Sequence, residues 1–277
     1  VSDWLGNTTT FAYSPDSDLK TITFPSSSGN VDTYTYDNDD QIDGAQMAQG
    51  QTTIASLAYA RDPNGALTSD TENGLPQPAL QGTRGYGYDN ADNMTQLEGN
   101  TGYTYDQANE LTSSPGYTYT YDQLGERTAA TPASGTGSTY AYDQAERLAA
   151  STAPSGTSTT YAYNGDGLRA STTSGGGTSD FTWDQSNDLP SLLTDGADSY
   201  IYGPTGVPIE QISPSGTPSY LHHDQLGSIR LLTDQNGNPT SAFTYSPYGT
   251  LAASIGSAKA SFGYAGQYTD PQTGLIY

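Results

Sequence analysis

The sequence predicts an all-β protein in the form of a spiralling ribbon of stacked β-hairpins, with few or no helices. Three observations predict this fold. A short unit with the pattern Tyr-x-Tyr-Asp recurs, and the stretch from Tyr119 to Ala150 holds two copies that start 21 residues apart, at Tyr119 and Tyr140. Tyr and Thr, which favour strands, dominate the units. No segment has the 3.6-residue apolar period of a helix. Because so short a unit cannot bury a core alone, the copies are expected to stack.

The second aromatic residue of each unit marks the repeat along the chain. The aligned positions are Tyr13, Tyr36, Tyr88, Tyr105, Tyr121, Tyr142, Tyr163, Trp183, Tyr202, His222, Tyr245 and Tyr264. A degenerate copy lies at Tyr59-Ala-Arg-Asp62. In six units an acid directly follows the aromatic residue, and these acids are Asp37, Asp89, Asp106, Asp122, Asp143 and Asp184. We expect the aromatic residues and the acids to be structural repeat positions.

Each unit has the features of a hairpin. Alternation of Tyr with Thr or Ala places both rings on one face of a strand, and the Asp, Asn or Gly that follows ends the strand in a turn. The return strands are expected to carry Leu111, Leu148, Leu168 or Leu189. The basic residues that recur after the turn, expected to pair with turn acids, are Arg127, Arg147 and Arg169. Aromatic contacts between strands would contribute roughly 0.2–1 kcal/mol each.

The regularity of the repeat divides the chain into three segments of one continuous β structure. Residues 1–84 have wider spacing and a polar insertion at Asp70–Gly82, which indicates repeats with longer loops. Residues 85–219 hold the regular repeats. Residues 220–277 carry a different set of motifs.

The composition excludes several classes of protein. A net charge of −22, from 30 acidic and 8 basic residues, argues against a nucleic-acid partner. The 23 tyrosines argue against disorder, and the absence of cysteine excludes disulfides and thiolate sites. No apolar run is long enough for a membrane span. The chain starts at Val1 with no export-signal pattern, so we expect any signal to have been removed or to lie upstream. The acidic surface fits a protein outside the cell or at its surface.

The Tyr-Asp units closely resemble the YD repeats of the RHS family, which includes bacterial toxin shells, wall-associated proteins and teneurins. The last fifth is more specific, because Tyr220–Arg230, Phe243–Gly249, Phe262–Tyr268 and Asp270–Tyr277 resemble the RHS-associated core that ends the shell. The residues that carry this core motif are His223, Asp224, Leu226, Gly227, Arg230, Tyr248, Gly249, Gly266, Asp270, Pro271, Gly274 and Leu275. In the family, many members cut themselves in a segment beyond this core, using aspartates, and release a C-terminal toxin. The sequence ends at Tyr277, before such a segment, and Asp270 is not assigned that role.

No catalytic, cofactor-binding or metal-binding residue is predicted. His222 and His223 are the only histidines, and adjacent strand residues point to opposite faces, so their rings would not converge on one ion. A Ser-His-Asp triad stays open, but no Gly-x-Ser-x-Gly elbow supports one. The acid clusters Asp37–Asp40 and Asp89–Asn93 resemble calcium loops without matching the EF-hand spacing, so turn formation is expected, with a bound cation as the alternative.

The expected function is a non-catalytic structural one, in the wall of an extracellular shell. About 24 strands at ~4.8 Å each give a ribbon of ~115 Å, which closes little more than one turn around a bore of roughly 35 Å. One chain therefore cannot seal a chamber. Either the chain is the C-terminal part of a longer toxin-encapsulating shell, or copies associate end to end as a tube or filament. Glycan-binding adhesion is the other alternative, since aromatic rows can stack on sugars. The candidate partners are further copies, more of the same chain, glycans or an encapsulated polypeptide.

Overall fold

The computed structural model describes residues 1–74, 82–186 and 188–277, and the predicted all-β fold is confirmed there. These residues form 25 strands in antiparallel sheets and one short 3-10 helix, η2 (Tyr264–Gly266). None of the described helical segments is long and apolar enough to cross a membrane. The chain divides into two compact units, unit 1 (residues 1–83 and 197–277) and unit 2 (residues 84–196). Residues 197–219 lie in unit 1, together with residues 1–83 and 220–277.

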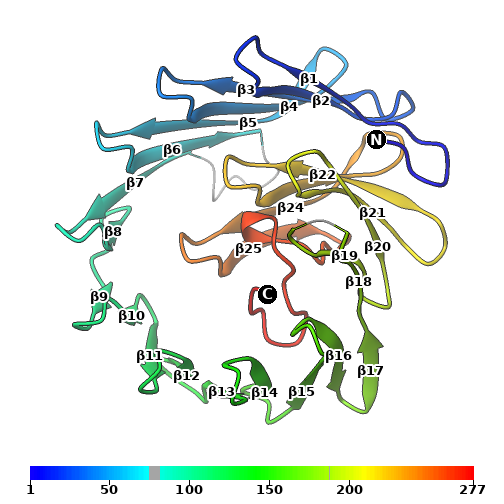
Figure 1. Ribbon diagram of the computed structural model, residues 1–277. Coiled ribbons are helices and arrows are strands. Elements are labelled where there is room, and N and C mark those ends of the chain that lie inside the picture. The colour runs from blue at the N-terminus through cyan, green and yellow to red at the C-terminus, as the bar shows by residue number, and fades with distance from the viewer. Residues whose placement is uncertain (75–81, 187) are drawn as a thin grey trace. The chain divides into compact units, whose positions relative to one another are not determined.

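Unit 1 contains two layers of consecutive antiparallel strands. The first layer comprises β1 (Thr10–Tyr13), β2 (Leu19–Thr23), β3 (Asn30–Tyr36), β4 (Ile42–Gln49), β5 (Thr52–Arg61) and β6 (Leu67–Asn73). The second comprises β20 (Ser199–Tyr202), β21 (Pro208–Ile212), β22 (Pro218–His223), β23 (Ile229–Thr233), β24 (Pro239–Tyr245) and β25 (Leu251–Gly256). Figure 1 shows β22 and β24 lying beneath the first-layer strands.

The hydrophobic core of unit 1 lies between these layers. Alternate side chains of the first layer face side chains of the second, and the buried cluster consists of Ile22, Phe24, Tyr34, Ala45, Met47, Ala55, Leu57, Tyr220, Leu231 and Ala242. Burial of one large apolar side chain stabilises a fold by roughly 1.5–3 kcal/mol. The core therefore joins strands that are far apart in the sequence.

The second layer is covered on its other face as well. Every residue of β21 and β23 is buried, a pattern typical of strands with both faces covered. The C-terminal segment provides part of the cover, since the Phe262 ring packs against Tyr200, Tyr202 and Tyr268 at centroid distances of 4.8, 6.1 and 5.9 Å. The amide of Ile229 also donates to the carbonyl of Gly263.

Unit 2 is built from the regular repeats. Its nine-stranded sheet comprises β9 (Thr104–Tyr105), β10 (Leu111–Ser114), β11 (Tyr117–Tyr121), β12 (Arg127–Pro132), β13 (Ser138–Tyr142), β14 (Leu148–Thr152), β15 (Ser158–Tyr163), β16 (Arg169–Ser174) and β17 (Gly177–Asp180). Two further hairpins are β7 (Gly82–Tyr88) with β8 (Met94–Leu97), and β18 (Thr182–Asp184) with β19 (Ser191–Thr194). Leu189 was expected on a return strand, but it precedes β19 and is 82% exposed, whereas Leu192 is buried.

The hairpin turns share one hydrogen-bonded geometry. The side-chain oxygen of the first turn residue accepts the main-chain N–H groups of the second and fourth residues after it. This occurs at Asp37, Asp62, Asp89, Asp106, Asp122, Asp143, Asn164, Asp224 and Asp234. The residue three positions after it has a positive φ, as Gly125 and Gly167 do, a conformation that glycine adopts without strain. Turn acids thus serve as main-chain acceptors.

Asn164→Ala removes the acceptor of the Asp166 and Leu168 amides. We expect it to lower the free energy of unfolding by about 1 kcal/mol, as measured by chemical denaturation. Asn164→Asp is the matched control, because aspartate occupies the equivalent position in the neighbouring turns, and its stability should stay near that of the unsubstituted protein. Equal stability of the Ala and Asp variants would contradict this role of the turn residue.

Candidate functional site

A repeated side-chain hydrogen bond joins many of the hairpins to the one before it. The last or second-last residue of a strand donates to the main-chain carbonyl of the first residue of the preceding return strand. We call this series the donor ladder. Its members are Tyr36 to Leu19, Arg61 to Ile42, Tyr105 to Met94, Tyr121 to Leu111, Tyr142 to Arg127, Tyr163 to Leu148, Trp183 to Arg169 and His223 to Pro208, at 2.7–3.1 Å.

A β-bulge accompanies the ladder residue in most of these hairpins. The strand register shifts between Thr120 and Tyr121, and equivalent shifts precede Tyr36, Arg61, Tyr142, Tyr163 and His223. A bulge re-aims the side chain that follows it. The local backbone irregularity therefore recurs where the side chain reaches across to the neighbouring hairpin.

The ladder explains three residues that depart from the tyrosine pattern. Arg61, Trp183 and His223 each present an N–H donor where the other hairpins present a tyrosine hydroxyl. The alignment placed His222 at this position, but the bulge between His222 and His223 assigns it to His223. A sequence signal was available: the residue directly before the turn acid carries an N–H or O–H donor, whether it is Tyr, Arg, Trp or His.

The environment of the ladder tyrosines keeps them in the donating form. Burial raises the pKa of Tyr36, Tyr121 and Tyr142, and nearby acids raise it further. For Tyr121 and Tyr142, Arg127 opposes part of this effect. The phenols therefore stay protonated at neutral pH and can donate to the carbonyls.

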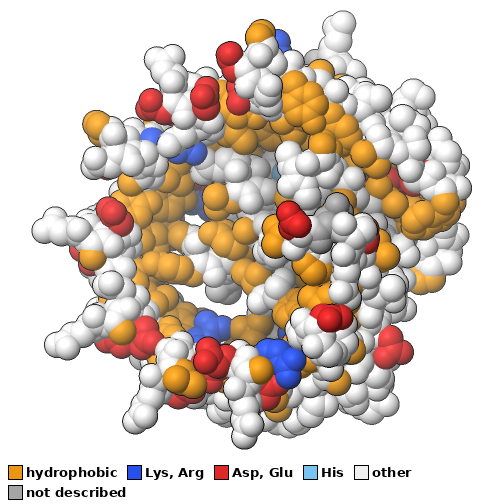
Figure 2. Space-filling model, viewed as in Figure 1, with side chains coloured by type: hydrophobic (Ala, Val, Ile, Leu, Met, Phe, Trp, Pro, Cys, Tyr) orange, Lys and Arg blue, Asp and Glu red, His pale blue; other side chains and the backbone are white. Residues whose placement is uncertain are grey.

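Arginines pack over the aromatic rings of unit 2. The Arg127 guanidinium lies over Tyr119 and Tyr140, 5.6 and 5.3 Å from the ring centroids, and Arg169 lies 4.4 Å from that of Tyr161. Arg147 lies 4.7 Å from the Tyr163 centroid and, as expected, pairs with its turn acid Asp143 at 2.7 Å. Figure 2 shows basic side chains beside acidic and hydrophobic ones over the unit 2 strands at the bottom of the view. Cation–π contacts thus connect successive hairpins.

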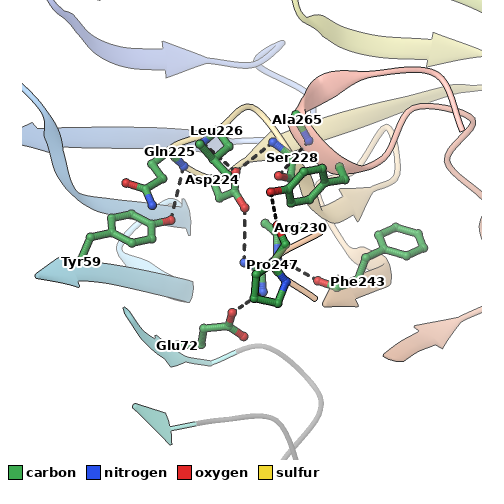
Figure 3. A network of polar contacts seen from close by, with 11 residues as sticks. Tyr59, Glu72, Asp224, Gln225, Leu226, Ser228, Arg230, Phe243, Pro247 and Ala265 are labelled. Atoms are coloured by element: carbon green, nitrogen blue, oxygen red, sulfur yellow. Dashed lines mark hydrogen bonds and ion pairs between the residues drawn. The ribbon is translucent and has the colours of Figure 1, made fainter. Parts of the chain in front are cut away.

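A second site, the interlayer polar cluster, lies between the layers of unit 1 and includes Asp32, Glu72, His222, Asp224 and Arg230. A terminal nitrogen of Arg230 contacts Glu72 of β6 at 2.5 Å, its Nε donates to the Phe243 carbonyl at 2.9 Å, and Asp224 lies 3.5 Å away. Figure 3 shows the Arg230 side chain at the centre of these contacts. Because an unpaired buried charge is strongly destabilising, this pairing favours one alignment of the layers.

His222 forms the other half of the cluster. Its Nδ1 lies 2.7 Å from Asp32 Oδ1 and its Nε2 lies 2.9 Å from Thr233 Oγ1. The order hydroxyl, imidazole, carboxylate resembles a hydrolytic triad, yet His222 and Thr233 are 0% exposed. A nucleophile needs access to substrate, so this geometry fits a tie between β3, β22 and β23. Burial raises the pKa of Asp32, and His222 offsets part of this rise.

The two histidines point to different partners, as the sequence indicated. His222 contacts the first layer, whereas His223 Nε2 contacts the Pro208 carbonyl at 2.9 Å. That contact requires the proton on Nε2, and Nδ1 has no hydrogen-bond partner. Burial and the neighbouring His222 lower the pKa of His223 to about 4, so its ring is neutral at pH 7.

The remaining core-motif residues lie in turns and in the C-terminal segment of unit 1. Asp224 accepts the amides of Leu226 and Ser228, and Asp270, 1% exposed, accepts those of Gln272 and Thr273. Leu226 and Tyr248 are exposed. The glycines with positive φ are Gly227, Gly249, Gly266 and Gly274. Pro271 is exposed, and the Leu275 carbonyl accepts the Asp270 amide. Across the described ranges, no three His, Cys, Asp or Glu side chains form a metal-binding group.

His223→Gln tests the buried neutral imidazole, because the Gln amide can still donate to Pro208 but does not titrate. The folded-state pKa of His223 lies below its ordinary 6.5, so the unfolded chain binds more protons between pH 6.5 and about 4, and stability falls on acidification. In denaturation experiments across this range, the unsubstituted protein should lose up to about 3 kcal/mol more than the variant. Identical pH dependence would contradict this assignment.

The comparisons with known proteins agree with this architecture. The family model described as teneurin YD-shell matches residues 20–277. No curated protein matched. Among solved structures, the crystal structure of TcdB2-TccC3-TEV has 16% identity and a TM-score of 0.69, covering 98% of this chain and 17% of that chain. The crystal structure of TcdB2-TccC3 has 15% identity and a TM-score of 0.58, covering 97% of this chain and 17% of that chain.

At these identities the solved structures establish a shared fold. The family match extends over both units and includes all eight ladder donors, from Tyr36 to His223. The chain spans less than a fifth of the length of the matched structures. On the family match, together with the stacked hairpins, the chain belongs to the teneurin YD-shell family.

Proposed function

We propose that this chain forms a section of the wall of an extracellular or cell-surface shell, without catalytic activity. The donor ladder carries the proposal, because it repeats one hairpin-to-hairpin fastening with Tyr, Arg, Trp or His as the donor. A binding or catalytic site concentrates distinctive residues at one place, whereas this chain repeats the same contact from β3 to β22. Membership of a shell-forming family supports the same role.

The polar side chains that invite a catalytic interpretation have structural partners. His222 and Thr233 are enclosed between the layers, and Arg230 is paired with Glu72. Trp183, the first candidate for stacking on a sugar, uses its indole N–H in the ladder. These contacts favour a structural wall function rather than an enzymatic or a glycan-binding function.

We further propose that the wall continues beyond the two edge strands of unit 1. Within the described part of the chain, β1 pairs only with β2 and β25 only with β24. An unpaired strand edge is a template for another strand. The additional strands would come from more of the same polypeptide or from the edge of a second copy; the matched chain of TcdB2-TccC3-TEV is longer than this one, which is compatible with the first source.

Imaging by negative-stain microscopy, with sedimentation velocity on the same samples, tests this proposal. End-to-end association predicts strings at high concentration that Leu251→Lys abolishes, since a lysine on the exposed edge strand β25 blocks pairing. Leu124→Lys, at an exposed hairpin tip in unit 2, is the matched control and should still form strings. Discrete monomers at every concentration would exclude self-association and leave continuation within a longer polypeptide.

Two results would contradict the wall function itself. One is hydrolytic activity that disappears in His222→Ala or His223→Ala but persists in a surface variant of equal stability. The other is a cell-wall pull-down that retains the chain and fails with Trp183→Ala. A pull-down unaffected by Trp183→Ala would exclude Trp183 as a sugar platform.

A further inference from the structure

One hairpin turn of unit 2 holds an asparagine–glycine pair in a geometry that the wall function does not explain. The sequence contains four such pairs, Asn64-Gly65, Asn73-Gly74, Asn164-Gly165 and Asn236-Gly237. Asn73 ends β6, whereas the other three pairs lie in hairpin turns. Asn164 is the first residue of its turn, but Asn64 and Asn236 are the third residues of theirs. The glycine amides of the three pairs therefore have different surroundings.

An asparagine side chain can react with the main-chain amide that follows it. The amide nitrogen of the next residue loses its proton to water or hydroxide and attacks the side-chain carbon Cγ, while Nδ2 takes up a proton and leaves as ammonia. Water then opens the resulting succinimide ring to aspartate or to isoaspartate. The reaction consumes water and needs no other reactant. It is favoured before glycine, because no side chain obstructs the approach of the nitrogen.

The amide of Gly165 is accessible for this attack. Gly165 is exposed, and within the described ranges its N–H donates no hydrogen bond. The Gly65 amide, by contrast, donates to the Asp62 carbonyl at 3.0 Å. The amide of the buried Gly237 donates to the Asp234 carbonyl at 2.9 Å. These two nitrogens must give up a hydrogen bond before they can react.

The Asn164 side chain is held in a way that favours attack on its Cγ. Its Oδ1 accepts the main-chain amides of Asp166 and Leu168, at 3.0 and 2.9 Å. Negative charge develops on this oxygen when the Gly165 nitrogen adds to Cγ. Two N–H donors already directed at an oxygen stabilise such an oxyanion. The turn thus combines an accessible nucleophile with an activated carbonyl.

We propose that Asn164 is a site of spontaneous covalent modification, at which the Gly165 nitrogen displaces the side-chain amide and the residue becomes aspartate or isoaspartate. Aspartate retains the turn, because Asp143 accepts the equivalent pair of amides in the preceding hairpin. Isoaspartate does not, because the main chain then passes through Cγ and is longer by a carbon atom. The inference goes beyond the proposed function and does not depend on it.

Peptide mapping by mass spectrometry of the complete folded chain, incubated at mildly alkaline pH, tests the proposal. Succinimide, aspartate and isoaspartate are quantified at each of the three turn asparagines. Asn164 should convert about tenfold faster than Asn64 and Asn236, because the glycine amides of those two pairs must first lose a hydrogen bond. In the urea-unfolded chain this difference should disappear.

Gly165→Ala is the matched variant. A Cβ added at Gly165 meets nothing within 4 Å, so the turn is retained while the methyl group obstructs the approach of the nitrogen to Cγ. Conversion of Asn164 in the folded variant should slow by about tenfold or more, and conversion of Asn64 and Asn236 should not change.

Three outcomes would overturn the proposal. The first is conversion of Asn164 as slow as that of Asn64 and Asn236 in the folded chain. The second is conversion of Asn164 that is much slower in the folded than in the unfolded chain, which would mean that the two donors to Oδ1 restrain the side chain instead of activating it. The third is unchanged conversion in Gly165→Ala, which would exclude the Gly165 nitrogen as the nucleophile.

Discussion

The donation of a side-chain N–H or O–H to a main-chain carbonyl of the preceding hairpin is the interaction on which the structure depends. A hairpin of two short strands is only marginally stable in water. Because only 33% of the residues are hydrophobic, each hairpin also contributes little to a hydrophobic core. The donor ladder places its hydrogen bond at the start of each return strand, for example from Tyr121 to the Leu111 carbonyl. The adjacent rings and arginines then cover the same face.

The interlayer polar cluster has a different role, because it sets how the end of the chain packs on its beginning. Asp32 and His222 are 190 residues apart in sequence, and Glu72 and Arg230 are 158 apart. Buried ion pairs are weak evidence for stability, but a wrong alignment would leave their charges unpaired. Apolar packing thus provides the contact between the layers, while the interlayer polar cluster restricts their alignment.

Sequence reasoning predicted what depends on local pattern. Alternation of Tyr with Thr predicted the strands, Asp122 and its equivalents predicted the turns, and strand geometry predicted that His222 and His223 point apart. It did not predict the return of residues 197–277 onto residues 1–83, because that depends on the twist accumulated over many hairpins. The alignment also marked His222 instead of His223 as the repeat position, because it counted the spacing of aromatic residues and not the position directly before the turn acid Asp224.

The most direct test of this account compares tyrosine hydroxyls by their effect on the free energy of unfolding. Tyr121→Phe and Tyr142→Phe each delete a ladder hydroxyl and leave the ring, whereas Tyr117→Phe deletes an exposed hydroxyl on the same sheet. The account predicts a loss of about 1 kcal/mol for each ladder variant and no change for Tyr117→Phe. Equal effects at the three positions would contradict the claim that the donor ladder holds the hairpins together.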